Sequence, residues 1–304
     1  MKRYLSFMLV IGLSLFQALQ VNAEKPDSVQ VKKSGLVVGL KYLSNNVYLG
    51  RLDSANIMYL VPSIGYYHKS GLHVEASLSY QFDAGINRID AFTLEGGYDF
   101  SIGDNFSGGL SAEKSFYDLN SMALNSVNDF GISSNFSYDF SIVTLNAGAG
   151  LAFNDKTDVI TEAGLNRSFE IGKLTIEPAL KLNAGTQNYY NSYLLAGKSH
   201  LNGNKGHGKA NGSAKGKSAN KGASTTTATT SDIYSILEAS KYKILDYEIS
   251  VPFSYNFHNF KFDVIPTYAI PVNPATILSS TGTVEKEAIS NHFVLQLGIT
   301  YKFN

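Results

Sequence analysis

The feature that most constrains this chain is an alternation of apolar and polar side chains that recurs along most of its length. The alternation is clearest between residues 292 and 304, where the apolar positions are Phe293, Leu295, Leu297, Ile299, Tyr301 and Phe303. Successive side chains of a β-strand point to opposite faces, so this stretch predicts a strand with one apolar face. Similar segments recur with lengths of roughly 9 to 11 residues, which suffice to cross a bilayer at a tilt.

The amino-terminal residues have the order of a secretory signal peptide. Lys2 and Arg3 precede a mostly apolar run from Leu9 to Phe16, and small residues end the segment at Ala23. We therefore expect residues 1–23 to be removed on export. Residues 24–34 are polar and aperiodic, which predicts a periplasmic tail. The chain has no cysteine, so neither a lipoprotein anchor nor a disulfide is expected.

Composition narrows the class of protein further. After the signal, no apolar stretch approaches the ~18 residues that a membrane helix requires. Charged residues make up 16% of the chain, below the roughly 25% of soluble domains. The 19 tyrosines and 18 phenylalanines suit the outer wall and aromatic girdles of a membrane barrel. Basic and acidic residues are balanced at 25 each, which argues against a nucleic-acid partner.

The alternating segments predict about twelve strands, an even number that places both termini on one side of a membrane. Short turns alternate with longer links such as 83–90 and 118–128, so we expect short periplasmic turns and longer extracellular loops. The expected fold is all-β, a closed antiparallel transmembrane β-barrel forming one domain over residues 35–304. The predicted strands cover residues 35–50, 56–67, 72–82, 91–100, 105–117, 129–140, 143–153, 159–170, 174–187, 243–257, 260–271 and 290–303.

Two local features refine this expectation. The tetrapeptide Tyr-Asp-Phe-Ser occurs at 98–101 and 138–141, each time before a short turn, which predicts aromatic side chains at the periplasmic rim. Pro178, Pro252 and Pro266 fall inside predicted strands, and we expect bulges there because proline has no N–H to donate.

Residues 194–232 break the alternation with a composition rich in Gly, Lys, Asn, Ser, Ala and Thr. Such a segment cannot bury enough apolar surface to fold alone, so a disordered extracellular loop is predicted. Its lysines have no acidic neighbours, and the loop is either a tolerated insertion or a tether attracted to phosphates of lipopolysaccharide. Residues 232–239 are predicted to form a short helix before the next strand.

A search for catalytic or metal-binding groups finds little. His68 and Ser70 have the chemistry of a base and a nucleophile, but both belong to one turn. The six histidines include no pair at a ligand spacing on a rigid element. We expect no catalytic residue, no metal site and no cofactor.

The polar face of the strands collects more acidic than basic side chains. Either these charges pair and fill the barrel, or they line a narrow path that favours cations. Glu75, Glu95 and Glu113 favour the path, because they lie on three consecutive strands that show no inward basic residue. The candidate inward residues are Glu75, Glu95, Asp99, Glu113, Asp139, Glu162, Glu177, Asp246, Glu248 and Asp263, against Lys41, Arg51, Lys181, Lys261 and Lys302.

With the signal peptide, the alternating segments and the terminal Ile299-Thr300-Tyr301-Lys302-Phe303, the chain resembles outer-membrane β-barrel proteins of Gram-negative bacteria, most closely those of Bacteroidota. In such families the barrel-assembly machinery recognises a final strand that ends in an aromatic residue. The resemblance therefore implies that residues 292–304 bind this machinery, although here Asn304 follows Phe303. It also implies an outer-membrane location among lipid and lipopolysaccharide, and it carries no catalytic residue across.

The expected function is a narrow cation-preferring channel or a structural or surface-display barrel. A hydrolase that acts on membrane lipid is the alternative.

Overall fold

The computed structural model describes residues 33–53, 57–83, 86–128, 130–196, 234–279 and 281–303. The predicted signal peptide lies outside the described residues, as do the predicted tail apart from residues 33–34 and the predicted basic loop apart from residues 194–196. Over the described ranges, no helix has the length and apolar character needed to cross a membrane.

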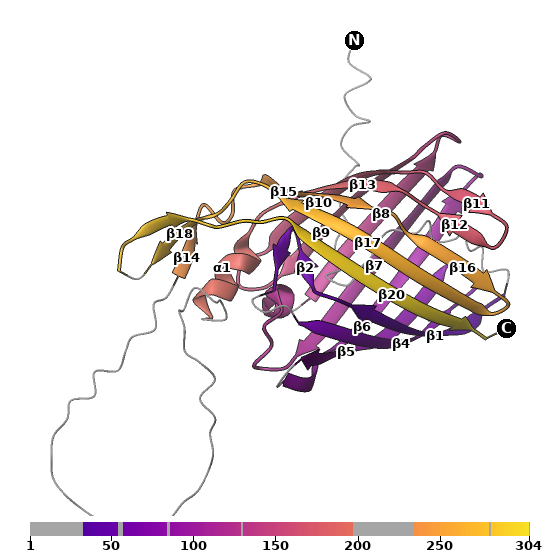
Figure 1. The fold of residues 1–304 in the computed structure, drawn as a ribbon, viewed down its shortest axis with the longest axis horizontal. Helices are drawn as coiled ribbons and strands as arrows, with labels where there is room; N and C mark the ends of the chain where they lie inside the picture. The colour runs from indigo at the N-terminus through magenta and orange to yellow at the C-terminus, as the bar shows by residue number, and fades with distance from the viewer. Residues whose placement is uncertain are drawn as a thin grey trace, which may run out of the picture.

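The described chain forms a closed antiparallel β-barrel whose strands follow one another around the wall in chain order (Figure 1). The main sheet contains fifteen segments, and because three wall strands are each split in two, the wall has twelve strands. The last strand closes the barrel by pairing with the first, from Lys302 opposite Val37 to Gln296 opposite Leu43. The predicted fold class is confirmed.

The wall strands have the following bounds. They are β1 (Gly35–Leu43), β4 (Met58–Tyr67), β5 (Leu72–Asp83), β6 (Ile86–Ile102), β7 (Phe106–Tyr117), β8 (Phe130–Asp139), β9 (Thr144–Phe153), β10 (Asp158–Asn166) with β11 (Phe169–Ile171), β12 (Leu174–Ile176) with β13 (Ala179–Gly185), β15 (Lys243–Ser250) with β16 (Phe253–Phe257), β17 (Phe260–Pro271) and β20 (His292–Lys302). The predicted link at 83–90 is wrong, because β5 runs to Asp83 and β6 begins at Ile86. The polar residues Asn87 and Arg88 continue the ladder by pairing with Phe82 and Gln81.

Apolar side chains cover the outside of the wall. Leu72 and Val74 are 56% and 52% exposed, whereas His73 and Glu75 beside them are partly buried. The same alternation runs around the barrel, so the outer surface is the apolar band that a membrane-spanning barrel presents to lipid. The exposed apolar residues of the wall include Leu36, Val38, Leu40, Ile64, Val74, Leu94, Leu110, Leu145, Leu165, Leu180, Ile249, Val264, Leu297 and Ile299.

Short turns gather at one end of the barrel, together with both described ends of the chain. The Phe303 N–H donates to the Leu36 carbonyl (2.8 Å), and the Lys69 N–H donates to Ser34 Oγ (3.1 Å). Aromatic rings lie along this turn end, as the Tyr-Asp-Phe-Ser repeats predict: the ring centroids of Phe100 and Phe106 are 6.2 Å apart, and Phe106 stacks on Phe136.

Three prolines lie on neighbouring strands, and two of them interrupt the ladder. Pro178 separates β12 from β13 and Pro252 separates β15 from β16, while β17 runs through Pro266 without a break. Each proline still accepts a hydrogen bond through its carbonyl, from the N–H of Arg167 (3.2 Å), Glu177 (2.9 Å) and Val251 (3.2 Å) respectively. The ladder therefore breaks at the first two prolines instead of bulging, because each removes a donor.

The other end of the barrel is covered by a folded group of loop elements, which we call the cap (Figure 1). One expectation for this region is wrong: residues 232–239 contain a strand and not a helix, because Tyr234–Leu237 pairs with Thr276–Ser279. The cap consists of the hairpin β2 (Val47–Tyr48) and β3 (Arg51–Leu52), the turn η1 (Leu124–Val127), the helix α1 (Asn188–Leu195), and a sheet of β14 (Tyr234–Leu237), β18 (Thr276–Ser279) and β19 (Val284–Lys286).

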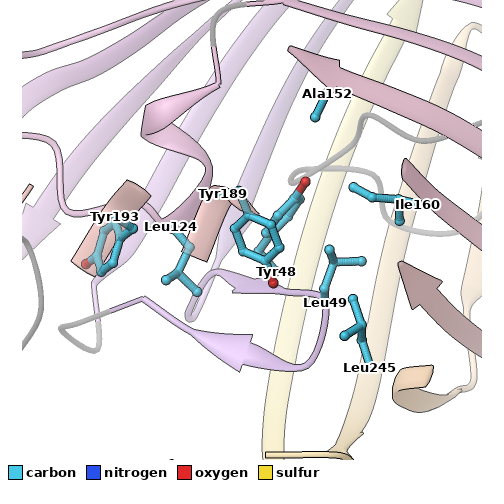
Figure 2. Close-up of a cluster of buried hydrophobic side chains, with 8 residues drawn as sticks. All are labelled: Tyr48, Leu49, Leu124, Ala152, Ile160, Tyr189, Tyr193 and Leu245. Atoms are coloured by element: carbon cyan, nitrogen blue, oxygen red, sulfur yellow. The ribbon is translucent and has the colours of Figure 1, made fainter. Parts of the chain in front are cut away.

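The cap has an apolar core that is shared with the wall. Figure 2 shows Tyr48 of the hairpin against Tyr189 of α1, with ring centroids 4.8 Å apart and planes at 88°. Wall side chains complete the cluster, so the cap packs on the inside of the strands as one body with them. The members are Tyr48, Leu49, Leu124, Ala152, Ile160, Tyr189, Tyr193 and Leu245.

Candidate functional site

Three glutamates lie side by side on adjacent strands of the wall. Glu75 of β5 is the register partner of Glu95 of β6, which is in turn the partner of Glu113 of β7. Directly opposed residues in an antiparallel pair have Cβ atoms about 4.5 to 5.5 Å apart. We call this set the acidic row. Because barrel strands are tilted, the row climbs from near the turn end at Glu75 toward the cap at Glu113.

The acidic row has neutral hydrogen-bond partners and one histidine. The Tyr67 hydroxyl donates to Glu75 Oε2 (2.8 Å), and Ser115 Oγ donates to Glu113 Oε1 over a longer 3.4 Å. Within the described ranges, no lysine or arginine forms an ion pair with any member of the row. The row is therefore a patch of carboxylates whose charge lysine and arginine do not neutralise.

His73 is an inward basic side chain that the sequence analysis left out of the candidate set. Its Nδ1 lies 3.0 Å from Asp99 Oδ2 and its Nε2 lies 3.6 Å from Glu95 Oε1. The expectation that these three strands carry no inward basic group is thus wrong at one position. The signal that identifies His73 is its parity, because it stands two residues before Glu75 and therefore shares its face.

On the far side of the barrel, two lysines lie close to carboxylates. Lys181 of β13 is the register partner of Glu248 of β15, and its Nζ lies 2.9 Å from Glu248 Oε2. On β17, Lys261 Nζ lies 3.5 Å from Asp263 Oδ1, which also accepts a hydrogen bond from Ser254 Oγ (2.7 Å). The far wall also carries Asp246 of β15, which is completely buried and forms no ion pair with another described residue. The two walls therefore differ in their cations, because lysines lie beside carboxylates on the far wall and His73 lies beside Glu95 on the near wall.

The remaining candidate residues are spread around the wall. Glu162 of β10 lies opposite Asn183, two residues along the ladder from the pair of Gly164 with Lys181. Glu177 is buried at the break between β12 and β13, where Ser168 Oγ donates to it. Lys41 faces Gly298 across the closing pair, and Lys302 ends β20. Neither of these two lysines forms an ion pair with another described residue.

Inward side chains differ in exposure along the barrel. The side chains of Glu95, Asp99 and Lys181 remain 23%, 37% and 27% exposed. In contrast, Gln81 and Asp158, close to the loop end, are completely buried, and Asn166, toward the turn end, is only 4% exposed. The polar interior is therefore exposed at some positions and tightly packed at others.

A buried ion pair ties the first loop of the chain to the last. Arg51 Nε donates to Glu287 Oε1 (3.0 Å) and Arg51 Nη2 to Glu287 Oε2 (2.9 Å), with side chains only 4% and 8% exposed. The Ala275 N–H also donates to Glu287 Oε2 (2.9 Å). The sequence analysis counted Arg51 among the inward wall residues, but it lies in the cap hairpin, because a carboxylate from a loop 236 positions away binds it there.

A buried carboxyl joins the first loop to the third. Asp53 accepts hydrogen bonds from Asn46 Nδ2 (2.9 Å), the Tyr59 hydroxyl (3.0 Å) and the Leu124 N–H (2.9 Å). No basic side chain of the described residues forms an ion pair with it, and burial raises the pKa of Asp53 from its usual 3.8 to about 7. The charge state of this link between cap elements therefore changes close to neutral pH.

Helix α1 is held at its amino end by the wall. Asp158, the first residue of β10, accepts hydrogen bonds from the backbone N–H groups of Asn188 (2.7 Å) and Tyr189 (2.6 Å) and from Thr186 Oγ1 (2.6 Å). A carboxylate at this position satisfies free N–H groups of the first turn and complements the helix dipole. The fifth loop is therefore anchored directly to a wall strand.

The structure offers little support for a hydrolytic site at His68. Ser70 Oγ lies 2.8 Å from His68 Nδ1, and the backbone N–H of Ser70 points to the same nitrogen (3.2 Å). This contact closes the exposed turn between β4 and β5, and no third group orients the histidine, as a nucleophile and base require. Within the described ranges, no group of three or more His, Cys, Asp or Glu side chains is arranged to hold a metal ion.

No family model matches the sequence, and no curated protein matches it. Among solved structures the chain is similar to the KdgM porin, at 12% identity over 88% of this chain and 99% of that chain with a TM-score of 0.44. It is similar to the NanC porin (11%, 88% and 100%, TM-score 0.46) and to an outer-membrane channel from Pseudomonas putida F1 (9%, 89% and 96%, TM-score 0.45). Likenesses this distant carry no argument about function, so the function is inferred from the geometry of the wall.

Proposed function

We propose that this protein is an outer-membrane β-barrel that forms a narrow channel with a preference for cations. The observation that carries the proposal is the acidic row, in which Glu75, Glu95 and Glu113 are direct register partners and have no lysine or arginine partner among the described residues. Adjacent carboxylates in a confined aqueous space raise the local concentration of cations and repel anions.

The distribution of cations supports the proposal. On the far wall, Lys181 pairs with Glu248, while Glu162 and Asp246 near it form no ion pair with a described residue. On the near wall, His73 is the one basic side chain among the described residues that lies at ion-pair distance from the acidic row. A cation that enters from the turn end would therefore be attracted to one side of the lumen, along the rising line of the acidic row.

Location and orientation follow from the outer surface and the turns. The exposed apolar band favours insertion among membrane lipid, and the short turns and chain ends at one end favour a periplasmic turn end with the cap outside, near lipopolysaccharide. Export by the predicted signal peptide and recognition of residues 292–304 by the barrel-assembly machinery belong to the same proposal. In intact cells, trypsin should cut after the lysines between residues 198 and 221. Cleavage that occurs only after the outer membrane is opened would show that the proposed orientation is inverted.

Two other functions remain to be tested against this one. A structural or surface-display barrel is favoured by the dense packing of the cap, which closes the loop end, and it predicts no conductance in any salt. A lipid hydrolase would release fatty acid from phospholipid or lipopolysaccharide after reconstitution. We expect no such release, because the exposed contact of His68 with Ser70 closes a turn.

Planar-bilayer recording in a salt gradient tests the channel. The reversal potential of the wild type should indicate cation preference, and replacing Glu75, Glu95 and Glu113 together by glutamine should reduce that preference. Glu285→Gln is the control for the loss of a carboxylate outside the wall, because Glu285 lies exposed on β19, and it is matched in charge to each single variant, Glu75→Gln, Glu95→Gln and Glu113→Gln. A reversal potential that favours anions, or one that the triple variant leaves unchanged, would contradict the proposal.

A further inference from the structure

The acidic row ends at a small cavity beneath the cap. Glu113, the highest member of the row, lines this cavity with Ser115 and Tyr117 of the same strand and with Asn125 and Asn128 of the third loop. Its volume is about 10 Å³, which is room for about one water-sized particle. The polar groups around it come from two separate elements, β7 and the loop that contains η1.

Two buried amides at this cavity each have one end without a partner. Asn125 and Asn128 are only 5% and 6% exposed, and Asn125 Oδ1 and Asn128 Nδ2 have no hydrogen-bond partner. Their orientations are fixed at the opposite ends, because Asn125 Nδ2 donates to the Tyr117 hydroxyl (2.5 Å) and Asn128 Oδ1 accepts from Asn154 Nδ2 (3.0 Å). Burying an amide group without a partner is costly, so a ligand that completes these bonds would stabilise the site.

The chemistry of the free groups identifies the ligand class. Hard cations prefer oxygen ligands. The cavity offers the carboxylate of Glu113, the free Oδ1 of Asn125 and the hydroxyls of Ser115 and Tyr117. A single carboxylate balances one positive charge, whereas calcium sites recruit several carboxylates. Asn128 lines the same cavity, but its free N–H is a donor and supplies no ligand to a cation.

We propose that a monovalent alkali cation, sodium or potassium, binds between Glu113 and Asn125 beneath the cap, at the upper end of the acidic row. The inference deepens the proposed channel function by naming the point at which a permeating cation is held before it reaches the cap. Glu113 and Asn125 are the ligands from the wall and the loop, and the cavity has room for the ion alone. The ion thereby links the third loop to β7.

Titration of the refolded full-length protein in detergent with sodium ions, followed by ²³Na relaxation, tests the site. The wild type and Glu285→Gln should show a saturable component that Glu113→Gln and Asn125→Leu both lose, while all four proteins keep heat-modifiable migration on a detergent gel. Asn125→Leu leaves the carboxylate in place and so separates coordination from general charge. Absence of a saturable component in the wild type, or its persistence in Glu113→Gln, would overturn the inference.

The result is separable from that of the channel proposal. Cation-selective conductance without saturable sodium binding would contradict the proposed site and support the proposed channel. Saturable binding that Glu113→Gln loses, in a protein that does not conduct, would support the site and contradict the channel.

Discussion

The ion pair of Arg51 with Glu287 should control how often the cap opens. Glu287→Ala leaves the Arg51 guanidinium buried with no acidic partner, and it also removes the acceptor of the Ala275 N–H. Removing one partner of a buried pair costs about 3 to 5 kcal/mol. At about 1.4 kcal/mol per factor of ten, the open population of the cap should rise by about 100-fold to 4,000-fold.

Hydrogen exchange followed by mass spectrometry measures this population. Amides in the cap hairpin and in η1 should lose protection by the stated factor, while amides in β6 and β7 should keep theirs, because the wall ladder does not depend on the pair. Glu285→Gln, two positions away and exposed, should change neither region. Replacing the pair together, with Arg51→Met and Glu287→Leu, should recover most of the protection, since no charge is left buried.

An unchanged exchange rate in Glu287→Ala would refute the reasoning. It would mean that apolar packing around Tyr48 and Tyr189 alone keeps the cap closed.

Two further predictions concern pH and the turns. Because the pKa of Asp53 is raised in the folded protein, the folded cap still holds a proton at pH values where the unfolded chain has released it. The stability of the cap should therefore be greatest below about pH 3.8 and fall as the pH rises to about 7. In hydrogen exchange corrected for the intrinsic effect of pH on amide exchange, Asp53→Asn should abolish this dependence, and a cap that gains stability over the same range would contradict the prediction. Gly71→Ala should destabilise the barrel by more than about 1 kcal/mol in urea, because Gly71 has φ +98° and an added Cβ would lie 2.0 Å from the Asp99 carbonyl oxygen. Gly172→Ala, with positive φ but open space around it, should cost less, and equal costs would contradict the argument.

The wall could be predicted from sequence because its signal is local. Alternation within each strand sets which face meets lipid, and turns such as Gly172-Lys173 mark the hairpins, so strand number and parity follow without knowledge of distant contacts. The prediction failed at the start of β6, where Arg88 and Asp90 replace the apolar alternation. There the ladder is sustained by register pairing and by the contact of Arg88 with Asp90 (3.2 Å), neither of which leaves a periodic pattern.

The cap could not be predicted, because its contacts join residues that are far apart in the chain. Arg51 meets Glu287 across 236 positions, and Asp53 meets the Leu124 N–H across 71. Parity alone also assigned Arg51 to the wall, since the period-two rule says nothing about a strand that leaves the barrel. The same distance dependence explains β14, whose strand conformation depends on its pairing with β18.

The acidic row could be predicted from the sequence only in part. The sequence identifies Glu75, Glu95 and Glu113 as residues of one parity on three consecutive strands, but their exact opposition depends on hairpin register. That register is set by the turns at both ends of β6, one of which was predicted too long.

The central claim is that water reaches the acidic row inside the barrel, while lipid covers the neighbouring residues of the same strands, whose side chains point outward. The chain has no cysteine, so single-cysteine variants report one position each. In proteoliposomes, Glu95→Cys should react with a positively charged, membrane-impermeant thiol reagent, whereas Leu94→Cys, on the exposed apolar face, should remain unmodified. Reaction at Leu94→Cys with none at Glu95→Cys, or no reaction at either position, would contradict the account.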